Sequence, residues 1–546
     1  MKFLKTKLIA VLVALAMVLV LAACGSKTTT SDAQGGQMVE TEVTEDSAPK
    51  STNTDMFTDR DLDPSYEDAT TMDLSKESAS KVTISKAGTY ILTGTYNGQV
   101  VVNVGSEDKV QLVLDDVTLA NNSSAAIYVQ SGDKVFVTLK DGTANKISSS
   151  ASFSSADTDT GDNIDGAIWS KATLVFNGSG KLSVSCANGH GIVSKDDLKV
   201  TGGTITVNAG KKALAGKDSV RIHDGVLDLT AGDDAIHTSN DEDEDKGFVY
   251  IEGGTVTIDS GDDGIHAETD LTIAGGVINI TKSYEGLEGQ DIAISGGKID
   301  IVASDDGINA SEGGNGKDNT TDFGGFGGGG GFADNQNATL TISGGTINVD
   351  AGGDGLDSNG SMTVSGGTTY VSGPTNGGNG SIDCDNASIT GGTVIATGAA
   401  GMAVNFGSNS TQCSMLVAFD GNVSGGTEVT LKDSSGKTIL SYTPNKDYQT
   451  VVLSSPDIKT GETYTVEAGS QSQTVEMTDT IYGSGGMMGG HGGMGQQGGM
   501  GQQGGFGGQQ GGHGGRGSFD MERAQSGNAP DAQSSATVDS QSSATM

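Results

Sequence analysis

The sequence predicts an all-β fold: a right-handed parallel β-helix with coils of about 22 residues, a small C-terminal β cap and disordered ends. Three observations lead to this fold. The 546 residues include 87 glycines but only 6 prolines. Each glycine inside a helix costs roughly 1 kcal/mol relative to alanine, which argues against a helical bundle. Apolar residues also recur at a nearly constant interval, and short alternating segments end at paired glycines.

The repeat is defined by an apolar anchor residue that follows a small or flexible residue. Ile192, Leu214 and Ile236 follow one another at intervals of 22 residues. Each anchor is followed by two alternating segments that meet at Gly-Gly or Asp-Gly, residues that suit tight corners. A β-sandwich of hairpins is the competing fold, but it does not explain a constant period. The anchors are Ile192, Leu214, Ile236, Ile265, Leu287, Ile308, Leu356 and Ile382.

Composition divides the chain into five segments. We expect a lipoprotein signal peptide over 1–23, a disordered tether over 24–78 and the β-helix over 79–413. Alternating strands over 414–482 predict a cap, which a solenoid needs because its last coil exposes a sheet edge. Residues 483–546, rich in Gly, Gln and Met, predict a disordered tail. Longer intervals between anchors, such as the glycine run from Gly324 to Phe332, predict loops at coil boundaries.

The first segment is typical of a secretory signal. Lys2, Lys5 and Lys7 precede an apolar run that ends Leu21-Ala22-Ala23-Cys24-Gly25. This ending resembles a bacterial lipobox, in which cleavage leaves the cysteine with a diacylglycerol group. We therefore expect lipidation at Cys24 and a protein anchored to the outer face of the bacterial cell membrane. An ordinary signal peptide or a short membrane helix is the alternative.

The charge of the chain is strongly negative. It carries 69 acids and 31 bases, a formal net charge of −38. A nucleic-acid-binding protein needs a basic face to neutralise phosphates, so the charge argues against this function. The question is then what the acids do.

Acids recur at fixed positions of the repeat. Equivalent positions in successive coils lie about 4.8 Å apart, where two carboxylates repel by about 3.5 kcal/mol at an effective dielectric of 20. Such a row favours a cation between its members, and oxygen ligands without cysteine favour calcium, Ca2+. The candidate ligands are Asp233, Asp234, Asp262, Asp263, Glu285, Glu288, Asp305, Asp306, Asp354 and Asp357.

Turn chemistry is the alternative explanation of these acids. Aspartate before glycine is common at corners because its side chain bonds the backbone two residues on. This explains Asp263-Gly264 and Asp306-Gly307, but not Glu285 or the polar residue after each anchor.

Histidines and cysteines add little. His237 and His266 occupy equivalent positions, so they stack, with transition-metal binding as a minor alternative. Alternation predicts Cys186 to be a buried thiol, whereas Cys384 and Cys413 either form one disulfide or remain thiols.

Residues from about Lys81 to Met402 resemble bacterial secreted carbohydrate-binding domain-containing proteins, which are calcium-binding parallel β-helices related in shape to pectate lyases. The resemblance lies in the strand Gly88-Thr89-Tyr90-Ile91-Leu92-Thr93-Gly94, the Asp-Gly-Ile/Leu repeat and the Ser-Gly-Gly corners. It implies calcium-dependent binding of a plant cell-wall polysaccharide, cellulosic or acidic and pectic, without established catalysis. It also implies that the acids of the Asp-Gly-Ile/Leu repeat are calcium ligands, although the coil at Glu285 departs from that pattern.

Three functions follow from these patterns. The first is a non-catalytic, cell-surface polysaccharide-binding protein. The second is a calcium-dependent polysaccharide lyase, which needs a lysine or arginine base near the metal. No pattern singles out one of the candidate bases Lys195, Lys211, Lys212, Lys217, Arg221, Lys282 and Lys298. The third is a surface adhesin or structural solenoid.

Overall fold

The computed structural model describes residues 56–153, 160–311, 337–384 and 386–483. The predicted signal peptide, Cys24, the tether up to residue 55, the glycine run at 324–332 and the tail beyond Gly483 lie outside these residues. Residues 56–78 differ from the predicted tether: they form α2 (Asp59–Leu62), β1 (Thr70–Asp73) and the 3-10 helix η1 (Leu74–Lys76). Neither helix of the described residues is long and apolar enough to cross a membrane.

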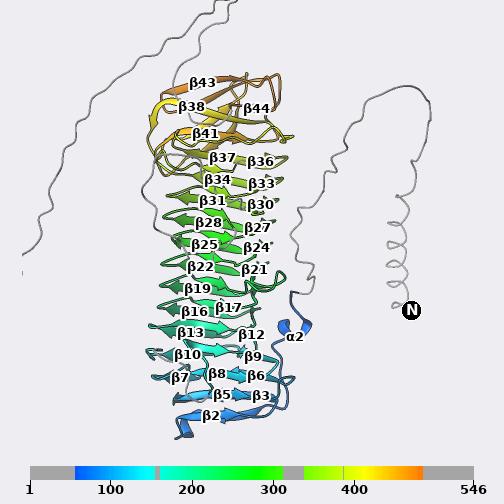
Figure 1. Cartoon of the computed structure of the whole chain (residues 1–546), viewed down its shortest axis with the longest axis vertical. Helices are drawn as coiled ribbons and strands as arrows, with labels where there is room; N and C mark the ends of the chain where they lie inside the picture. The colour runs from blue at the N-terminus through cyan, green and yellow to red at the C-terminus, as the bar shows by residue number, and fades with distance from the viewer. Residues whose placement is uncertain (1–55, 154–159, 312–336, 385, 484–546) are drawn as a thin grey trace, which may run out of the picture. The chain divides into compact units, whose positions relative to one another are not determined.

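The chain winds through three sheets, A, B and C, whose strands stack in parallel so that a typical coil adds one strand to each (Figure 1). The prediction of a nearly all-β chain with parallel sheets is confirmed. Sheet A contains β1, β3 (Gly88–Thr93), β6 (Lys109–Leu114), β9 (Lys134–Leu139), β12 (Thr173–Gly178), β15 (Asp197–Val200), β18 (Ser219–Ile222), β21 (Phe248–Ile251), β24 (Asp270–Ile273), β27 (Asp291–Ile294), β30 (Thr339–Ile342), β33 (Ser361–Val364) and β36 (Asn386–Ile389).

Sheet B contains the shortest strands, which are β2 (Lys81–Ile84), β5 (Gln99–Asn103), β8 (Ile127–Ser131), β11 (Gly166–Ser170), β14 (His190–Ser194), β17 (Leu214–Gly216), β20 (Ile236–Thr238), β23 (Ile265–His266), β26 (Leu287–Gly289), β29 (Ile308–Ala310), β32 (Leu356–Ser358) and β35 (Ile382–Asp383). The parallel part of sheet C contains β4 (Thr95–Asn97), β7 (Thr118–Asn121), β10 (Ala144–Ser149), β13 (Lys181–Cys186), β16 (Thr204–Ala209), β19 (Val226–Ala231), β22 (Thr255–Asp259), β25 (Val277–Lys282), β28 (Lys298–Ala303), β31 (Thr346–Ala351), β34 (Thr368–Ser372) and β37 (Thr393–Gly398).

The eight anchors form one column inside sheet B. Ile192 pairs with Leu214, Leu214 with Ile236, and so on without a break to Ile382. All eight side chains have 0% exposure. Full burial of an aliphatic side chain contributes about 1.5–3 kcal/mol, so this column is a large part of the core that sets the register of the coils.

The C-terminal residues end the parallel stack. Sheet C continues past β37 with β41 (Tyr448–Ser454), which runs antiparallel to it, and then β38 (Ser414–Val423) and β44 (Ile481–Tyr482). A fourth sheet, D, contains β40 (Thr438–Tyr442), β39 (Val429–Lys432), β42 (Thr463–Ala468) and β43 (Gln471–Glu476). A separate apolar cluster that includes Met415, Tyr448 and Val466 fills this cap. The reversal covers the last parallel strand of sheet C (Figure 1).

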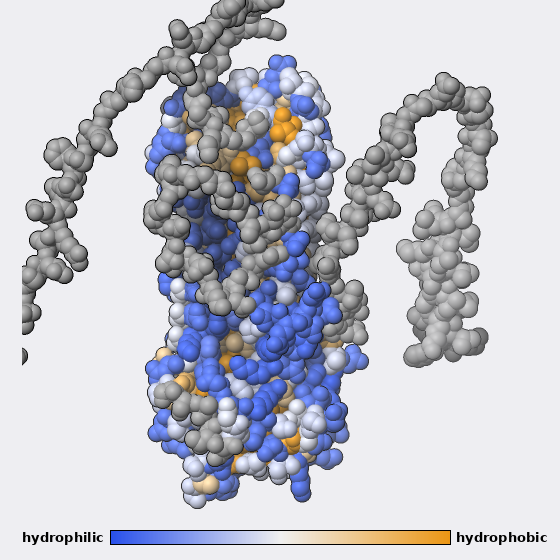
Figure 2. All heavy atoms as spheres, viewed as in Figure 1, coloured by the Kyte–Doolittle hydropathy of each residue, from blue (hydrophilic) through white to orange (hydrophobic). Residues whose placement is uncertain are grey.

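One face of the described surface is mainly hydrophilic, and the three cysteines of the described residues are buried. Hydrophilic residues cover most of the face shown in Figure 2. Cys186 is buried, as alternation predicts, and Cys413 is a free buried thiol, so the open alternative of a Cys384–Cys413 disulfide is excluded. The Cys384 thiol instead lies 3.9 Å from the Gly360 carbonyl oxygen.

We expect Gly276→Ala to destabilise the solenoid. Gly276 turns the corner between sheets A and C with φ +88°, and an added Cβ would lie 2.8 Å from the carbonyl oxygen of Gly253 in the neighbouring coil. The left-handed conformation alone costs a non-glycine residue about 1–3 kcal/mol. Thermal unfolding measures the effect, with Gly421→Ala as control because a Cβ there has no neighbour within 4 Å. Equal melting temperatures for the two variants would contradict this account of the corner.

Candidate functional site

The predicted acids come together along one edge of the solenoid, which we call the acidic edge. Five of them, Asp234, Asp263, Glu285, Asp306 and Asp354, each stand two residues before a strand of sheet B. The residues after the anchors form an adjacent column on the outer face of that sheet: His237, His266, Glu288, Asn309, Asp357 and Asp383 pair in register. The juxtaposition follows directly from the period of the sequence.

Corner carboxylates also hold the backbone of the next coil. Asp306 Oδ1 accepts a hydrogen bond from the Asp354 amide at 2.6 Å, and Asp354 Oδ1 accepts one from the Gly380 amide at 2.5 Å. In the same way, Asp234 Oδ1 accepts a hydrogen bond from the Asp263 amide, and Asp263 Oδ1 accepts one from the Glu285 amide, both at 3.3 Å. These bonds reach the next coil and not the backbone two residues on, so they differ from the predicted turn chemistry. They occupy one oxygen of each carboxylate, and the other remains for a side chain or a ligand.

The acids differ in what neutralises them. The first part of the edge is a cation-paired group: Asp233, Asp234, Asp263 and Glu288 with Lys212, His237 and His266. Lys212 contacts Asp234 directly and lies 3.6 Å from Asp233, while His237 Nδ1 lies 2.8 Å from Asp234 Oδ2. Burial alone would raise the pKa of Asp234, but its close contact with His237 and the charge of Lys212 lower it.

His266 supplies the second cation of this group. Its Nδ1 lies 3.3 Å from Asp263 and also contacts Glu288, and its ring stacks on that of His237 with centroids 4.8 Å apart. Although burial opposes the charged imidazole, the two carboxylates raise the pKa of His266 to about 10. The positively charged imidazolium of His266 thus lies between Asp263 and Glu288 and offsets the repulsion between their carboxylates.

The second part of the edge is an oxygen-only group: Glu285, Asp305, Asp306, Asp354 and Asp357. Within the described residues none of these five forms an ion pair with lysine, arginine or histidine. Burial, followed by repulsion from neighbouring carboxylates, raises the pKa of Glu285 to about 9 and that of Asp357 to about 8. Burial likewise raises the pKa of Asp306 to about 7 and of Asp354 to about 6.

The role of Lys212 as a cation beside the acids was not predicted from the sequence. It stands two residues before the anchor Leu214, the position that aspartate or glutamate occupies in later coils. Its side chain reaches the acids of the next coil. The sequence did contain a signal for this contact, since Lys212 occupies the position of the repeat at which the following coils have an acid.

Ligand chemistry separates the two groups further. Among the described residues, ligand atoms lie within 4.8 Å of one another in three sets: Asp234–His237–His266, Asp263–His266–Glu288 and Asp233–Asp234–Asp262. The first two contain histidine, and Lys212 contacts two acids of the third. The oxygen-only group has the donors a hard divalent ion prefers and no cation from the chain, but none of its five members belongs to these three sets.

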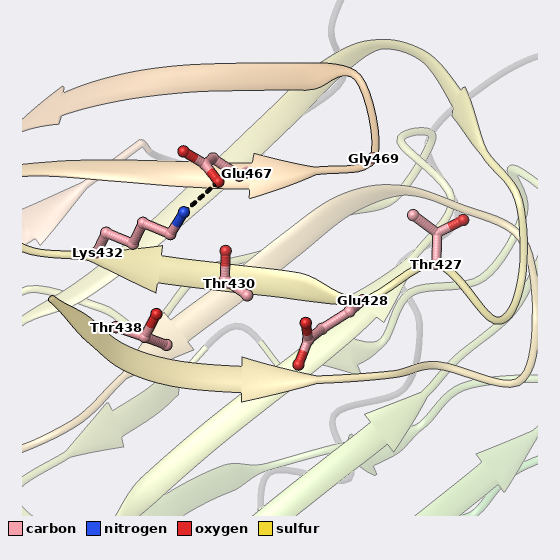
Figure 3. Close-up of a pocket in the computed structure, with 7 residues that line it drawn as sticks. All are labelled: Thr427, Glu428, Thr430, Lys432, Thr438, Glu467 and Gly469. Carbon is pink, nitrogen blue, oxygen red and sulfur yellow. Dashed lines mark hydrogen bonds and ion pairs between the residues drawn. The ribbon is translucent and has the colours of Figure 1, made fainter. Parts of the chain in front are cut away.

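A hollow in the cap lies apart from these acids in the fold. It is open, about 420 Å³ in volume, and lies over sheet D beside Thr427, Thr430 and Thr438 (Figure 3). Of its three charged residues, Lys432 and Glu467 pair with each other at 2.6 Å, and Glu428 is the third. The hollow therefore keeps one negative charge outside the ion pair.

The winding and its acidic edge define a parallel β-solenoid protein with a polyanionic flank. Residues 78–322, which are less than half of the chain, match the family described as carbohydrate-binding domain-containing protein. A relative of the same description from Acetivibrio thermocellus is 34% identical over 130 residues, which are 24% of this chain and 45% of the relative.

A solved structure is also similar in sequence. It is described as the polysaccharide lyase-like protein from C. thermocellum, gadolinium derivative. It is 33% identical, with a TM-score of 0.36, and the match covers 42% of this chain and 96% of that one.

Without calcium, we expect stability to fall as pH rises from about 5 to about 9. Carboxyl groups of the unfolded chain titrate near a pKa of about 4. In the folded chain the pKa values of Asp354, Asp306, Asp357 and Glu285 are raised to about 6, 7, 8 and 9. Between these limits the folded state binds more protons, so its advantage is lost as pH rises. His266 acts in the same direction, because its stabilising charge is lost as pH rises through about 10.

Melting temperatures in chelator at pH 5, 7 and 9 measure this effect. A melting temperature that stays level or rises over this range would contradict the charge distribution described for the acidic edge.

We expect Lys212→Met to lower the free energy of unfolding by about 3 kcal/mol, because it leaves Asp233 and Asp234 without their cation. Added calcium should restore part of the loss, since the freed oxygens suit a hard ion. Lys282→Met is the control: Lys282 is exposed and lies 3.6 Å from Asp259, a pair worth at most about 1 kcal/mol. A Lys212→Met protein as stable as the parent in chelator would rule out a neutralising role.

Proposed function

We propose that this protein is a non-catalytic, cell-surface lipoprotein that binds an acidic polysaccharide of plant cell-wall type through a calcium-loaded, right-handed β-helix. The match of residues 78–322 to the carbohydrate-binding family supports polysaccharide as the ligand. The curated relative is matched over only 45% of its length, so the function of the whole chain rests on the residues discussed above.

The observation that carries the proposal is the oxygen-only group. Half-buried carboxyls that repel one another and have no cationic side chain are costly unless a cation joins them. Glu285, Asp306, Asp354 and Asp357 are the residues that would hold calcium. When bound, the ion would supply positive charge to which the carboxylate of a uronic acid unit can coordinate as a further oxygen ligand. Asp233, Asp234, Asp263 and Glu288, which contact Lys212 or His266, serve mainly to hold the coils together.

The acidic sugar is favoured over cellulose for two reasons. Calcium on an anionic edge attracts a second anion, whereas a neutral glucan gains nothing from it. Flat binding of cellulose needs a row of exposed aromatic rings, and among the described residues Tyr284 and Tyr482 are the exposed aromatic side chains.

The finer features of the fold and the location belong to the same proposal. Crossovers between parallel strands of one sheet are right-handed in about 98% of cases, which supports right-handed winding with coils near 22 residues. The basic, apolar and Leu-Ala-Ala-Cys pattern around Cys24 supports a lipid anchor on the outer face of the bacterial cell membrane.

Binding of polygalacturonate measures the function. The mature protein should be retained on insoluble polygalacturonate in calcium and released by chelator, without any rise in absorbance at 235 nm from unsaturated products. Asp306→Asn combined with Asp357→Asn should lose both retention and the calcium-induced rise in melting temperature. Asp259→Asn, an exposed acid on sheet C, is the matched control and should behave as the parent.

Each outcome has a meaning. Growing absorbance at 235 nm would replace the binding protein with a lyase. Absence of retention on polygalacturonate and on cellulose in calcium would remove both carbohydrate functions and leave an adhesin or structural solenoid.

A further inference from the structure

The first described residues cross the outer face of sheet A. Residues 56–65, which we call the strap, include α2, and α2 lies beside β12 (Figure 1). The strap is far in sequence from the coils that it contacts: its hydrogen-bond partners lie 46 to 165 residues further along the chain. It covers side chains that would otherwise face solvent.

The centre of the strap is a fully buried carboxylate. Asp61 has 0% exposure, and its two oxygens lie 2.7 Å from Lys134 Nζ and 3.3 Å from Lys199 Nζ. The Thr58 amide also donates to it at 3.1 Å. Burial opposes its ionisation, yet these donors lower the pKa of Asp61, so the carboxylate is charged.

The surface under the strap is a row of hydrogen-bond donors. Lys199 and Arg221 pair in register on β15 and β18, and both donate to the Met56 carbonyl oxygen at 3.1 Å. Asn177 and Thr201 donate to the Asp61 carbonyl oxygen at 3.4 and 2.8 Å. In these contacts the sheet supplies the proton and the strap supplies the oxygen.

This cationic patch is local and unusual for a chain with 69 acids and 31 bases. On the same column of sheet A, the positions after Arg221 are Tyr250 and then Thr272, Ala293, Thr341, Thr363 and Ser388, which carry no charge. Asp197 is the acid that the sheet itself provides, 3.1 Å from Arg221 and 3.9 Å from Lys199. One acid for the three cations Lys134, Lys199 and Arg221 leaves two positive charges, and Asp61 neutralises one of them.

Few apolar contacts hold the strap. Phe57 packs against His223 and Tyr250, with ring centroids 5.3 and 6.5 Å apart, and the Arg60 guanidinium lies 4.7 Å from the centre of the Phe136 ring. Leu62, another large apolar residue of the strap, is 42% exposed. The attachment is therefore mainly polar, and another chain of carboxylates and hydroxyl oxygens can take the same donors.

We propose that the outer face of sheet A from Lys134 to Tyr250 is a binding groove for a polyuronate chain, and that the strap occupies it as an intramolecular competitor. Lys134 and Lys199 bind a uronate carboxylate in the place of Asp61, and Arg221 and Thr201 bind neighbouring oxygens. Phe136 and Tyr250 offer rings at the two ends of the groove. This inference rests on the proposed function and adds to it a second surface that needs no calcium.

Affinity for oligogalacturonate in chelator tests the groove, because calcium-dependent binding at the acidic edge is then absent. Asp61→Asn in the full mature chain weakens the strap, and removal of a competitor raises apparent affinity by the inverse of the open fraction, here at least about tenfold. Adding Lys199→Gln and Arg221→Gln should abolish that gain. Neutral cello-oligosaccharide is the ligand control and should bind none of the variants more tightly.

Hydrogen exchange of the parent protein provides a test that needs no variant. Saturating oligogalacturonate in chelator should raise exchange at residues 56–63 and leave the anchors of sheet B unchanged. Unchanged exchange in the strap, together with unchanged affinity of a folded Asp61→Asn protein, would show that the strap is a fixed structural part and would overturn the inference. If the parent still binds polygalacturonate in calcium, the proposed function stands on its own; if neither condition gives binding, both fail.

Discussion

The stacking of equivalent residues at the spacing of β-strands governs this molecule. A residue type that recurs in the sequence becomes a column in space, about 4.8 Å per step. For Ile192 to Ile382 the column is a dry core, because identical aliphatic chains pack well at that distance. For aspartate and glutamate the same spacing is repulsive, so a solenoid that repeats an acid must also provide a cation. The two parts of the acidic edge differ in the source of this cation.

Two solutions occur along one edge. Near β20, β23 and β26 the chain supplies its own cations, Lys212 and His266, and the carboxylates there contact them in one network. Beyond it, around β29 and β32, the acids face one another and the chain offers hydrogen-bond donors such as Asn309 in place of charge. Along the acidic edge, carboxylates with cationic partners from the chain are thus followed by carboxylates without such partners. Both groups lie at the same position of the repeat.

The sequence predicted those features that obey the period and missed those that do not. The anchors, the glycine corners and the alignment of the acids could be read from intervals of about 22 residues, because periodicity fixes which side chains share a face. The pairing of Lys212 with the next coil is a matter of side-chain reach, which spacing does not encode. The strap was missed for another reason: residues 56–65 lack an apolar pattern, and their partners Lys134, Lys199 and Arg221 lie far along the chain. Ion pairs at such separation leave no local signal.

The strap also fixes where the polypeptide leaves the solenoid. Met56 is held beside Lys199 and Arg221, on the flank of sheet A and several coils away from β1, the first strand of that sheet. A tether that ends in a lipid at Cys24 would therefore pull on the side of the stack and not on its end. Release of the strap would move the attachment point towards β1 and lengthen the tether, so the same contact that covers the groove would also set how far the protein reaches from the cell.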